Sequence, residues 1–145
     1  ESCDGKMIDQ DQILQYIEDC MNLYDIQQVN YDPAMSDKLV EKLENLGLEC
    51  VEVAQYPKVL NAPFDDVERL FYEKRIQFDN PLFLYCTLNV VAITNINGQK
   101  APSKRQSKKK IDGFVAFLCG HKETMNQMTD IDSDELDDYL SSIYR

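Results

Sequence analysis

Two aspartates, Asp32 and Asp112, could do chemistry because each stands at a point where a carboxylate would meet a ligand. Asp32 follows the β-like run IQQVNY and precedes Pro33, so it is expected to end a strand at the start of a helix. In open α/β sheets, ligands bind at the carboxyl ends of strands. The alternative explanation is structural, since Asp-Pro is a common helix start and Asp is a good N-cap.

Asp112 lies in the segment IDGFVAFLCG, which is otherwise apolar on every side and therefore predicts a buried helix. Because Val115, Ala116 and Cys119 share its helical face, we expect the carboxylate to project from a face that packs on a sheet. A lone charge there is costly unless it is paired or binds a metal. Gly113 weakens a helix by about 0.5–1 kcal/mol relative to alanine, which indicates a close backbone approach. Alternatively, Asp112 only interacts favourably with the helix dipole and with the nearby lysines.

Together the two aspartates predict a metal site. Both come from elements that are expected to flank one sheet, and carboxylate oxygens are the ligands that Mg²⁺ and Mn²⁺ prefer. Two such ions about 3.5–4 Å apart can activate a water and stabilise the leaving oxygen of a phosphodiester. We therefore expect the carboxylates of Asp32 and Asp112 to lie about 4–7 Å apart.

Basic residues gather just before Asp112. Six of the 15 lysines and arginines are Lys100, Lys104, Arg105, Lys108, Lys109 and Lys110. The net charge of −11 argues against a protein that coats nucleic acid in general. The Debye length is only about 8 Å at physiological salt, however, so the local field of this loop counts for more. A mobile basic loop beside an acidic metal site suits DNA; the alternative is a solvated turn.

Other catalytic chemistries lack their residues. The single histidine, His121, is expected to be a helix cap or a surface residue, so serine and cysteine nucleophiles have no base. There is no P-loop or G-x-G-x-x-G motif. The five cysteines are odd in number and form no C-x-x-C pair, which indicates free thiols in a reducing cytoplasm. No apolar run approaches the roughly 20 residues of a membrane span.

The elements that must position these residues alternate along the chain. The predicted helices cover residues 9–24, 33–46, 64–74, 82–88 and 109–120, and the predicted strands cover 26–31, 48–54, 75–78 and 90–96. Residues 56–63 are expected to form a loop, and Asn97-Gly98 a two-residue hairpin turn. This order predicts an α/β fold with parallel crossovers followed by a hairpin.

Four stretches resemble the C-terminal nuclease domain of the large terminase subunit of tailed phages. They are VNYDPAMSDKLVEKLE at 29–44, VEVAQYPKVLNAPFDDVERL at 51–70, NPLFLYCTLNVV at 80–91 and KKKIDGFVAFLCG at 108–120. The Y-D-P element, a Q-x₇-P-x₄-E-R-L pattern, an N-P…N-V-V pattern and a late I-D-G-x-V-A helix follow each other in the order and spacing of that family. The resemblance covers roughly residues 5–122.

The resemblance implies an RNase H-like mixed sheet flanked by helices. It implies a metal-dependent endonuclease that cuts concatemeric double-stranded DNA at the start and end of packaging. By motif, Asp32 matches the second acidic position of the family and Asp112 the third. The implied partners are the packaging ATPase domain, the small terminase subunit and the portal, in the cytoplasm of the bacterial host.

The chain departs from the family pattern at its beginning. The first acidic residue belongs on a strand upstream of residue 1, so we expect the opening strands to be missing and this piece alone to be inactive or weak. The later part of the nuclease domain is then expected at 1–124, followed by an acidic tail at 125–145 that can form a short helix. An unpaired sheet edge is expected to be covered by self-association. The alternative function is a non-catalytic docking module whose acidic face and tail bind the packaging partners.

Overall fold

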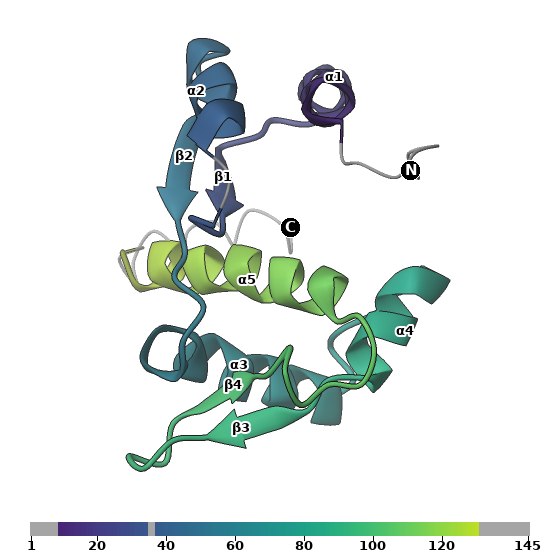
Figure 1. Ribbon diagram of the computed structural model, residues 1–145, viewed down its shortest axis with the longest axis vertical. Coiled ribbons are helices and arrows are strands. Elements are labelled where there is room, and N and C mark those ends of the chain that lie inside the picture. The colour runs from purple at the N-terminus through teal and green to yellow at the C-terminus, as the bar shows by residue number, and fades with distance from the viewer. Residues whose placement is uncertain (1–8, 35–36, 131–145) are drawn as a thin grey trace, which may run out of the picture. The chain divides into compact units, whose positions relative to one another are not determined.

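The computed structural model describes residues 9–34 and 37–130, and the chain divides into two compact units, Glu1–Ala54 and Gln55–Arg145 (Figure 1). Each unit combines helices with a two-stranded sheet, so the α/β class is confirmed. The last ten residues, where the sequence allows a short helix, lie outside the described residues. Within the described ranges, no helix has both the length and the apolar character that crossing a membrane requires.

The first unit is a β-α-β arrangement preceded by a helix. Its elements are α1 (Gln10–Met21), β1 (Gln28–Tyr31), α2 (Asp37–Asn45) and β2 (Glu49–Glu52). Strands β1 and β2 pair in parallel, with Val29 opposite Cys50. The crossover is possible in so few residues because Gly47, at φ +86°, reverses the chain directly after α2. Leu43 and Leu48 on either side of this turn are buried.

The second unit consists of three helices and a hairpin. Its elements are α3 (Pro57–Tyr72), α4 (Pro81–Leu88), β3 (Ala92–Thr94), β4 (Lys100–Pro102) and α5 (Asp112–Asp130). Helix α5 packs against both α3 and α4, and β4 lies along α3 (Figure 1). The rings of Phe64 on α3 and Phe114 on α5 meet edge to face, with centroids 6.1 Å apart. Leu60, Val67, Ile111 and Leu118 are almost fully buried around this contact.

Residues 57–63 are helical, so the predicted loop at 56–63 is wrong. Helix α3 begins at Pro57, which suits a first helical turn, and it continues through Pro63. Proline inside a helix removes one hydrogen bond, but here Leu60, Pro63 and Val67 share a buried face at helical spacing. Burial of that face therefore outweighs the breaker signal that Pro63 carries in the sequence.

Residues 75–78 form no strand, which corrects a second prediction. Helix α3 ends in a Schellman motif, where Lys74 adopts φ +58° and the backbone N–H of Arg75 donates to the carbonyl of Leu70 at 2.9 Å. Phe78 then packs edge to face against both Phe71 and Phe83. The apolar residues of this segment thus serve aromatic packing between α3 and α4.

Two further boundaries differ from expectation. The hairpin loop has three residues instead of two, because the N–H of Asn95 donates to the carbonyl of Gln99 and Gly98 alone has a positive φ, +78°. Helix α5 begins at Asp112 and runs to Asp130, well beyond the predicted end at residue 120. Gly120 therefore does not terminate the helix, and α5 continues into the region expected to be a tail.

Candidate functional site

Asp32 stands directly after β1, as the sequence predicts. The backbone N–H of Ala34 donates to Asp32 Oδ1 at 3.1 Å, which closes a turn at the strand end. Pro33 and Ala34 lie in a bend and a turn outside α2 (Asp37–Asn45), so the predicted helix start at Pro33 is wrong. The turn instead holds the Asp32 carboxylate at the carboxyl end of a parallel strand, a position typical of ligand-binding residues.

Asp112 is the first residue of α5, and its side chain is 61% exposed. The expectation that it projects from a buried apolar face is therefore wrong. Ala116, one turn further on, is exposed as well, while Val115 and Cys119 are buried on the adjoining flank. Helix α5 is thus covered on one side by α3 and α4, and Asp112 lies at the start of its solvent-exposed side.

The predicted close backbone approach at Gly113 is confirmed. A Cβ atom at this position would lie 3.3 Å from Cys86 Sγ and 4.0 Å from a ring carbon of Phe83, both on α4. Such a contact is tighter than most side chains tolerate. Gly113 therefore lets α4 and α5 meet closely at the residue next to Asp112, which fixes the start of the helix.

The basic residues before Asp112 do not form one equivalent set. Lys100 belongs to β4, where its Nζ lies 3.1 Å from Asp65 Oδ1 and 3.0 Å from Glu68 Oε2 on α3. The hydrogen bond to Glu68 raises the pKa of Lys100 above its ordinary value. Its backbone N–H also donates to Asn61 Oδ1. Lys100 therefore fastens the hairpin to α3, a role that the sequence did not indicate.

The other five cations lie on an exposed loop. Lys104 Nζ lies 3.3 Å from Asp112 Oδ1, and Lys109 Nζ lies 5.5 Å from the ring centroid of Tyr85. Among the side chains that the structure describes, Arg105, Lys108 and Lys110 have no ion-pair partner. Buried Ser103 directly precedes Lys104, and buried Ser107 lies between Arg105 and Lys108. Their hydrogen bonds to Val91 brace the loop, which the sequence suggested to be mobile.

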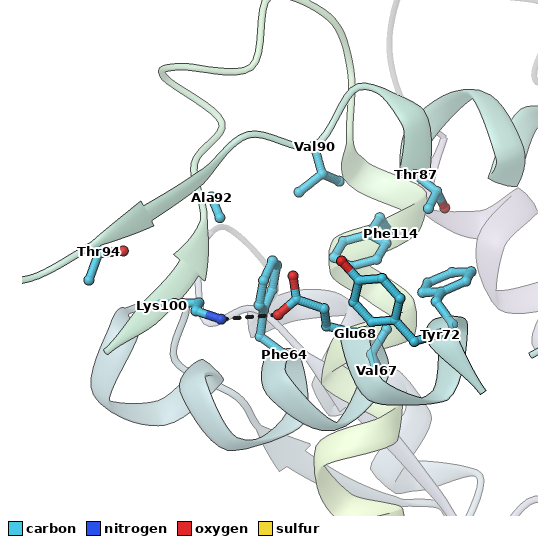
Figure 2. Close-up of a pocket in the computed structure, with 11 residues that line it drawn as sticks. Phe64, Val67, Glu68, Tyr72, Thr87, Val90, Ala92, Thr94, Lys100 and Phe114 are labelled. Carbon is cyan, nitrogen blue, oxygen red and sulfur yellow. Dashed lines mark hydrogen bonds and ion pairs between the residues drawn. The ribbon is translucent and has the colours of Figure 1, made fainter. Parts of the chain in front are cut away.

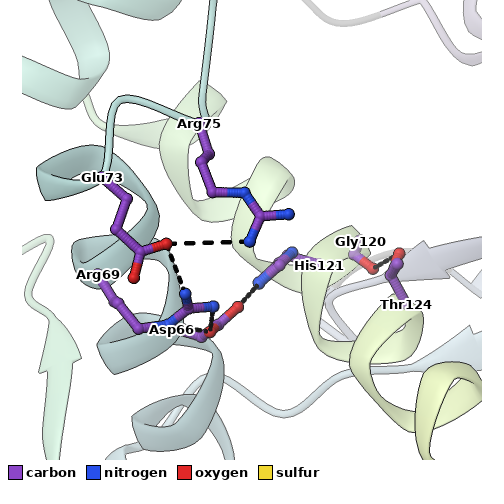
Figure 3. Close-up of polar contacts among 7 residues, drawn as sticks. All are labelled: Asp66, Arg69, Glu73, Arg75, Gly120, His121 and Thr124. Atoms are coloured by element: carbon purple, nitrogen blue, oxygen red, sulfur yellow. Dashed lines mark hydrogen bonds and ion pairs between the residues drawn. The ribbon is translucent and has the colours of Figure 1, made fainter.

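A polar network that the sequence analysis missed joins α3 to α5 (Figure 3). His121 Nε2 lies 2.8 Å from Asp66 Oδ2, and the His121 ring stacks on Phe117. Arg69 binds the other oxygen of Asp66 and also contacts Glu73 at 2.7 Å. The hydrogen bond from Arg69, together with that from His121, holds the pKa of Asp66 below its ordinary value.

His121 is thus neither a cap nor a surface residue, because α5 continues past it and its side chain is only 15% exposed. The spacing of Asp66, Arg69 and Glu73 at three and four residues is the usual signature of ion pairs along a helix. That signal was available in the sequence. The partner on α5 was not, because it lies 55 residues away in the chain.

An apolar pocket opens between α3, the hairpin and the start of α5 (Figure 2). Lys100 and Glu68, which form an ion pair, are among the residues that line it. The apolar lining includes Phe64, Val67, Phe71, Val90, Ala92 and Phe114. This pocket could not be predicted from the sequence, because its walls come from three separate segments.

The donor chemistry of the two aspartates fits a hard divalent cation, since both offer carboxylate oxygens. Asp112 is open to solvent and already attracts a cation, the ammonium of Lys104. In the part of the chain that the structure describes, no group of three or more His, Cys, Asp or Glu side chains is arranged to hold a metal. Asp32 lies in the first unit and Asp112 in the second, and an ion shared between them stays a prediction.

Comparisons with known proteins agree on one family. The family model described as terminase large subunit, endonuclease domain, matches residues 1–127. Among solved structures, the large terminase of HK97 bacteriophage is similar, with a TM-score of 0.73 and 22% sequence identity over 82% of this chain and 26% of that one. This chain thus spans about a quarter of that terminase, and an RNase H-like fold is consistent with the likeness. No protein with a curated description matches.

Proposed function

Because the chain belongs to the family of terminase large subunit endonuclease domains, we propose that it is part of a divalent-metal-dependent nuclease that cuts concatemeric DNA during viral packaging. The observation that carries this proposal is the family match over residues 1–127, a range that includes both Asp32 and Asp112. Its substrate is double-stranded DNA, and its place of action is the cytoplasm of a bacterial host. Mg²⁺ or Mn²⁺, if held by these carboxylates, would activate a water and stabilise the leaving oxygen of the phosphodiester.

Asp32 and Asp112 act as the metal ligands of this chain. The turn around Asp32 and the close approach at Gly113 each restrict where one carboxylate can lie, which lowers the entropic cost of binding an ion. In the assembled nuclease we expect the two carboxylates about 4–7 Å apart, the reach over which two ions are bridged.

The basic loop binds the DNA backbone. Arg105, Lys108 and Lys110 are exposed and have no ion-pair partner among the described residues, so they can reach phosphates at little cost. Lys104 and Lys109 hold exposed, weak contacts that DNA can displace. Lys100 is the least suited of the six, because two carboxylates already hold its ammonium.

Plasmid nicking tests the proposed ligands. In the full large subunit that carries this chain, Asp32→Asn and Asp112→Asn should each abolish Mn²⁺-dependent nicking while the circular dichroism spectrum and melting temperature stay close to wild type. Asp79→Asn is the matched control, because Asp79 is an exposed aspartate of the second unit outside the proposed site. Undiminished nicking by Asp112→Asn would refute its role.

A docking module remains the second candidate, in which the chain binds the ATPase domain, the small subunit or the portal without cutting DNA. Leu82 and Leu88 on α4 favour it, because large apolar side chains that are 70% and 75% exposed are typical of interaction surfaces. A thermal-shift titration separates the two. A Mn²⁺-induced rise in melting temperature that Asp32→Ala removes supports the nuclease, whereas no rise supports docking.

A further inference from the structure

The loop that carries Lys104 is held at both ends. The N–H of Ser103 donates to the carbonyl of Val91 at 2.9 Å, and the N–H of Val91 donates to Ser107 Oγ at 3.0 Å. The N–H of Ser107 donates back to the carbonyl of Ser103. Ser103, Ser107 and Ile111 are all buried, which anchors the loop at four-residue intervals. Lys104 and Asp112 therefore start from fixed backbone positions at opposite ends of one braced loop.

Lys104 and Asp112 face each other across a small polar pocket. The pocket is lined by Lys104, Lys109, Lys110, Ile111 and Asp112. The Nζ of Lys104 lies 3.3 Å from Asp112 Oδ1, and both side chains are more than half exposed. Exposed ion pairs are weak because water competes for both charges. The pair is therefore easily broken when a stronger partner arrives for either group.

We propose that Lys104 is a positioning residue that exchanges its partner when the nuclease binds its ligands. Without metal and DNA, its ammonium neutralises Asp112. When a divalent cation takes the carboxylate, the ammonium is released to a backbone phosphate of the DNA. This inference rests on the proposed function, in which Asp112 holds metal and the loop holds DNA.

The exchange follows from the charges around one carboxylate. A divalent cation and an ammonium repel each other at this distance, so both do not remain on Asp112 together. Lys109 and Lys110 line the same pocket, but in the described part of the chain Lys104 is the cation within ion-pair range of Asp112. Release of Lys104 then places a free cation beside the metal-bound carboxylate, where the phosphate must lie for the reaction.

A double-mutant cycle measures the exchange without metal. Binding of a short DNA duplex in EDTA is compared for wild type, Lys104→Gln, Asp112→Asn and the double variant of the full large subunit. Asp112→Asn removes repulsion of the phosphates in both backgrounds, but it also frees Lys104 in the wild-type background. We therefore expect its gain in affinity to be about 2- to 5-fold larger with Lys104 present, the size of an exposed ion pair.

Arg105 provides the matched control. It is an exposed cation on the same loop, next to Lys104, and no ion pair joins it to Asp112 or to any other described residue. Arg105→Gln should also weaken DNA binding, because it removes a cation from the same loop. A cycle of Arg105→Gln with Asp112→Asn should nevertheless show no coupling beyond experimental error.

Calorimetric titration with Mn²⁺ gives the second readout. Lys104→Gln should bind Mn²⁺ about 2- to 5-fold more tightly than wild type, because the competing ammonium is gone, and Lys104→Arg should restore the wild-type affinity. The exchange is overturned if DNA binds but the cycle shows no coupling. It is also overturned if Lys104→Gln leaves the Mn²⁺ affinity unchanged or weakens it. Absence of DNA binding by wild type overturns it together with the role of the loop. Nicking by wild type decides the proposed nuclease function separately.

Discussion

The charge of Asp66 takes part in the packing of the second unit. Its two carboxylate oxygens are divided between Arg69 on its own helix and His121 on α5. The side chain is 22% exposed, so these contacts lie at the edge of the interface between α3 and α5. Contacts of this kind stabilise the packing of α3 against α5.

The pKa of Asp66 predicts a loss of stability in acid. Since the hydrogen bond from Arg69 lowers this pKa below its ordinary 3.8, the ionised form stabilises the fold above that pH, and the contribution disappears as pH falls through the lowered pKa. We expect Asp66→Asn to lower the free energy of unfolding by about 1–2 kcal/mol at pH 7. The difference from wild type should shrink as the pH falls below about 4, the ordinary pKa of aspartate.

Urea denaturation at pH 7 and in steps down to pH 2.5 checks this prediction. Asp79→Asn serves as the control, because Asp79 is an exposed aspartate of the same unit. A constant difference between wild type and Asp66→Asn at every pH would contradict the role of the charge.

Gly113 and Gly120 provide a matched pair on one helix. Alanine normally stabilises a helix by about 0.5–1 kcal/mol relative to glycine, and nothing lies within 4 Å of a Cβ at Gly120. Gly120→Ala should therefore raise the free energy of unfolding. Gly113→Val should lower it by about 1–3 kcal/mol, because the added atoms meet Cys86 and Phe83. Chemical denaturation measures both, and equal stabilisation by the two substitutions would show that α4 yields at this contact.

At the scale of elements, helix starts and ends follow local chemistry closely. Helix α4 begins where the side chain of Asn80 accepts hydrogen bonds from the N–H groups of Leu82 and Phe83, at 2.9 and 3.0 Å. Pro81 occupies the first helical turn, where its missing N–H costs nothing. This short helix faces Gly113, so its position also sets the start of α5.

Removal of the α4 cap should loosen this part of the unit. Asn80→Ala is expected to lower the free energy of unfolding by about 1 kcal/mol, because two N–H groups lose their acceptor. Asn80→Ser keeps a side-chain oxygen and should lose less than half as much. Thermal melting of both variants is the measurement, and equal losses would show that the cap oxygen does not contribute.

At the scale of the whole molecule, charge is separated along the chain. The net charge is −11, yet Lys104 to Lys110 form a basic loop within it. Each phosphate contact contributes about −0.9 to the slope of log K against log salt. Replacing Arg105, Lys108 and Lys110 by glutamine should therefore weaken DNA binding and flatten that slope by about 2–3. Fluorescence anisotropy between 50 and 200 mM salt tests this, and an unchanged slope would show that DNA binds elsewhere.

Sheet edges lead to a second prediction at this scale. Strands β1 and β2 form a two-stranded parallel sheet, and within 9–34 and 37–130 no third strand pairs with either. An unpaired strand edge exposes backbone N–H and C=O groups, so we expect a further strand or a second copy of the chain to pair with this sheet. Light scattering of the isolated chain measures its mass, and a uniform monomer at high concentration would contradict association between copies.

Much of the architecture could be predicted because its signals are local. The stripe of apolar residues in α1, the Asn80-Pro81 start of α4 and the strand that ends before Asp32 each depend on residues a few positions apart. Gly113 likewise indicated a close contact, because glycine has no side chain that would prevent one. Local propensity and capping act within one or two helical turns, so the amino-acid sequence alone determines them.

Only the tertiary structure decided which faces are covered and which charges meet. Asp112 is exposed because α3 and α4 cover the other flank of α5, and Lys100 and His121 find their carboxylates 32 and 55 residues away. Pro63 stays helical because its face is buried. These outcomes depend on packing between distant segments, whose energies no local pattern encodes. The sequence alone therefore determined the helices, the strands and the candidate aspartates. The tertiary packing determined which residues contact these aspartates and the other charged side chains.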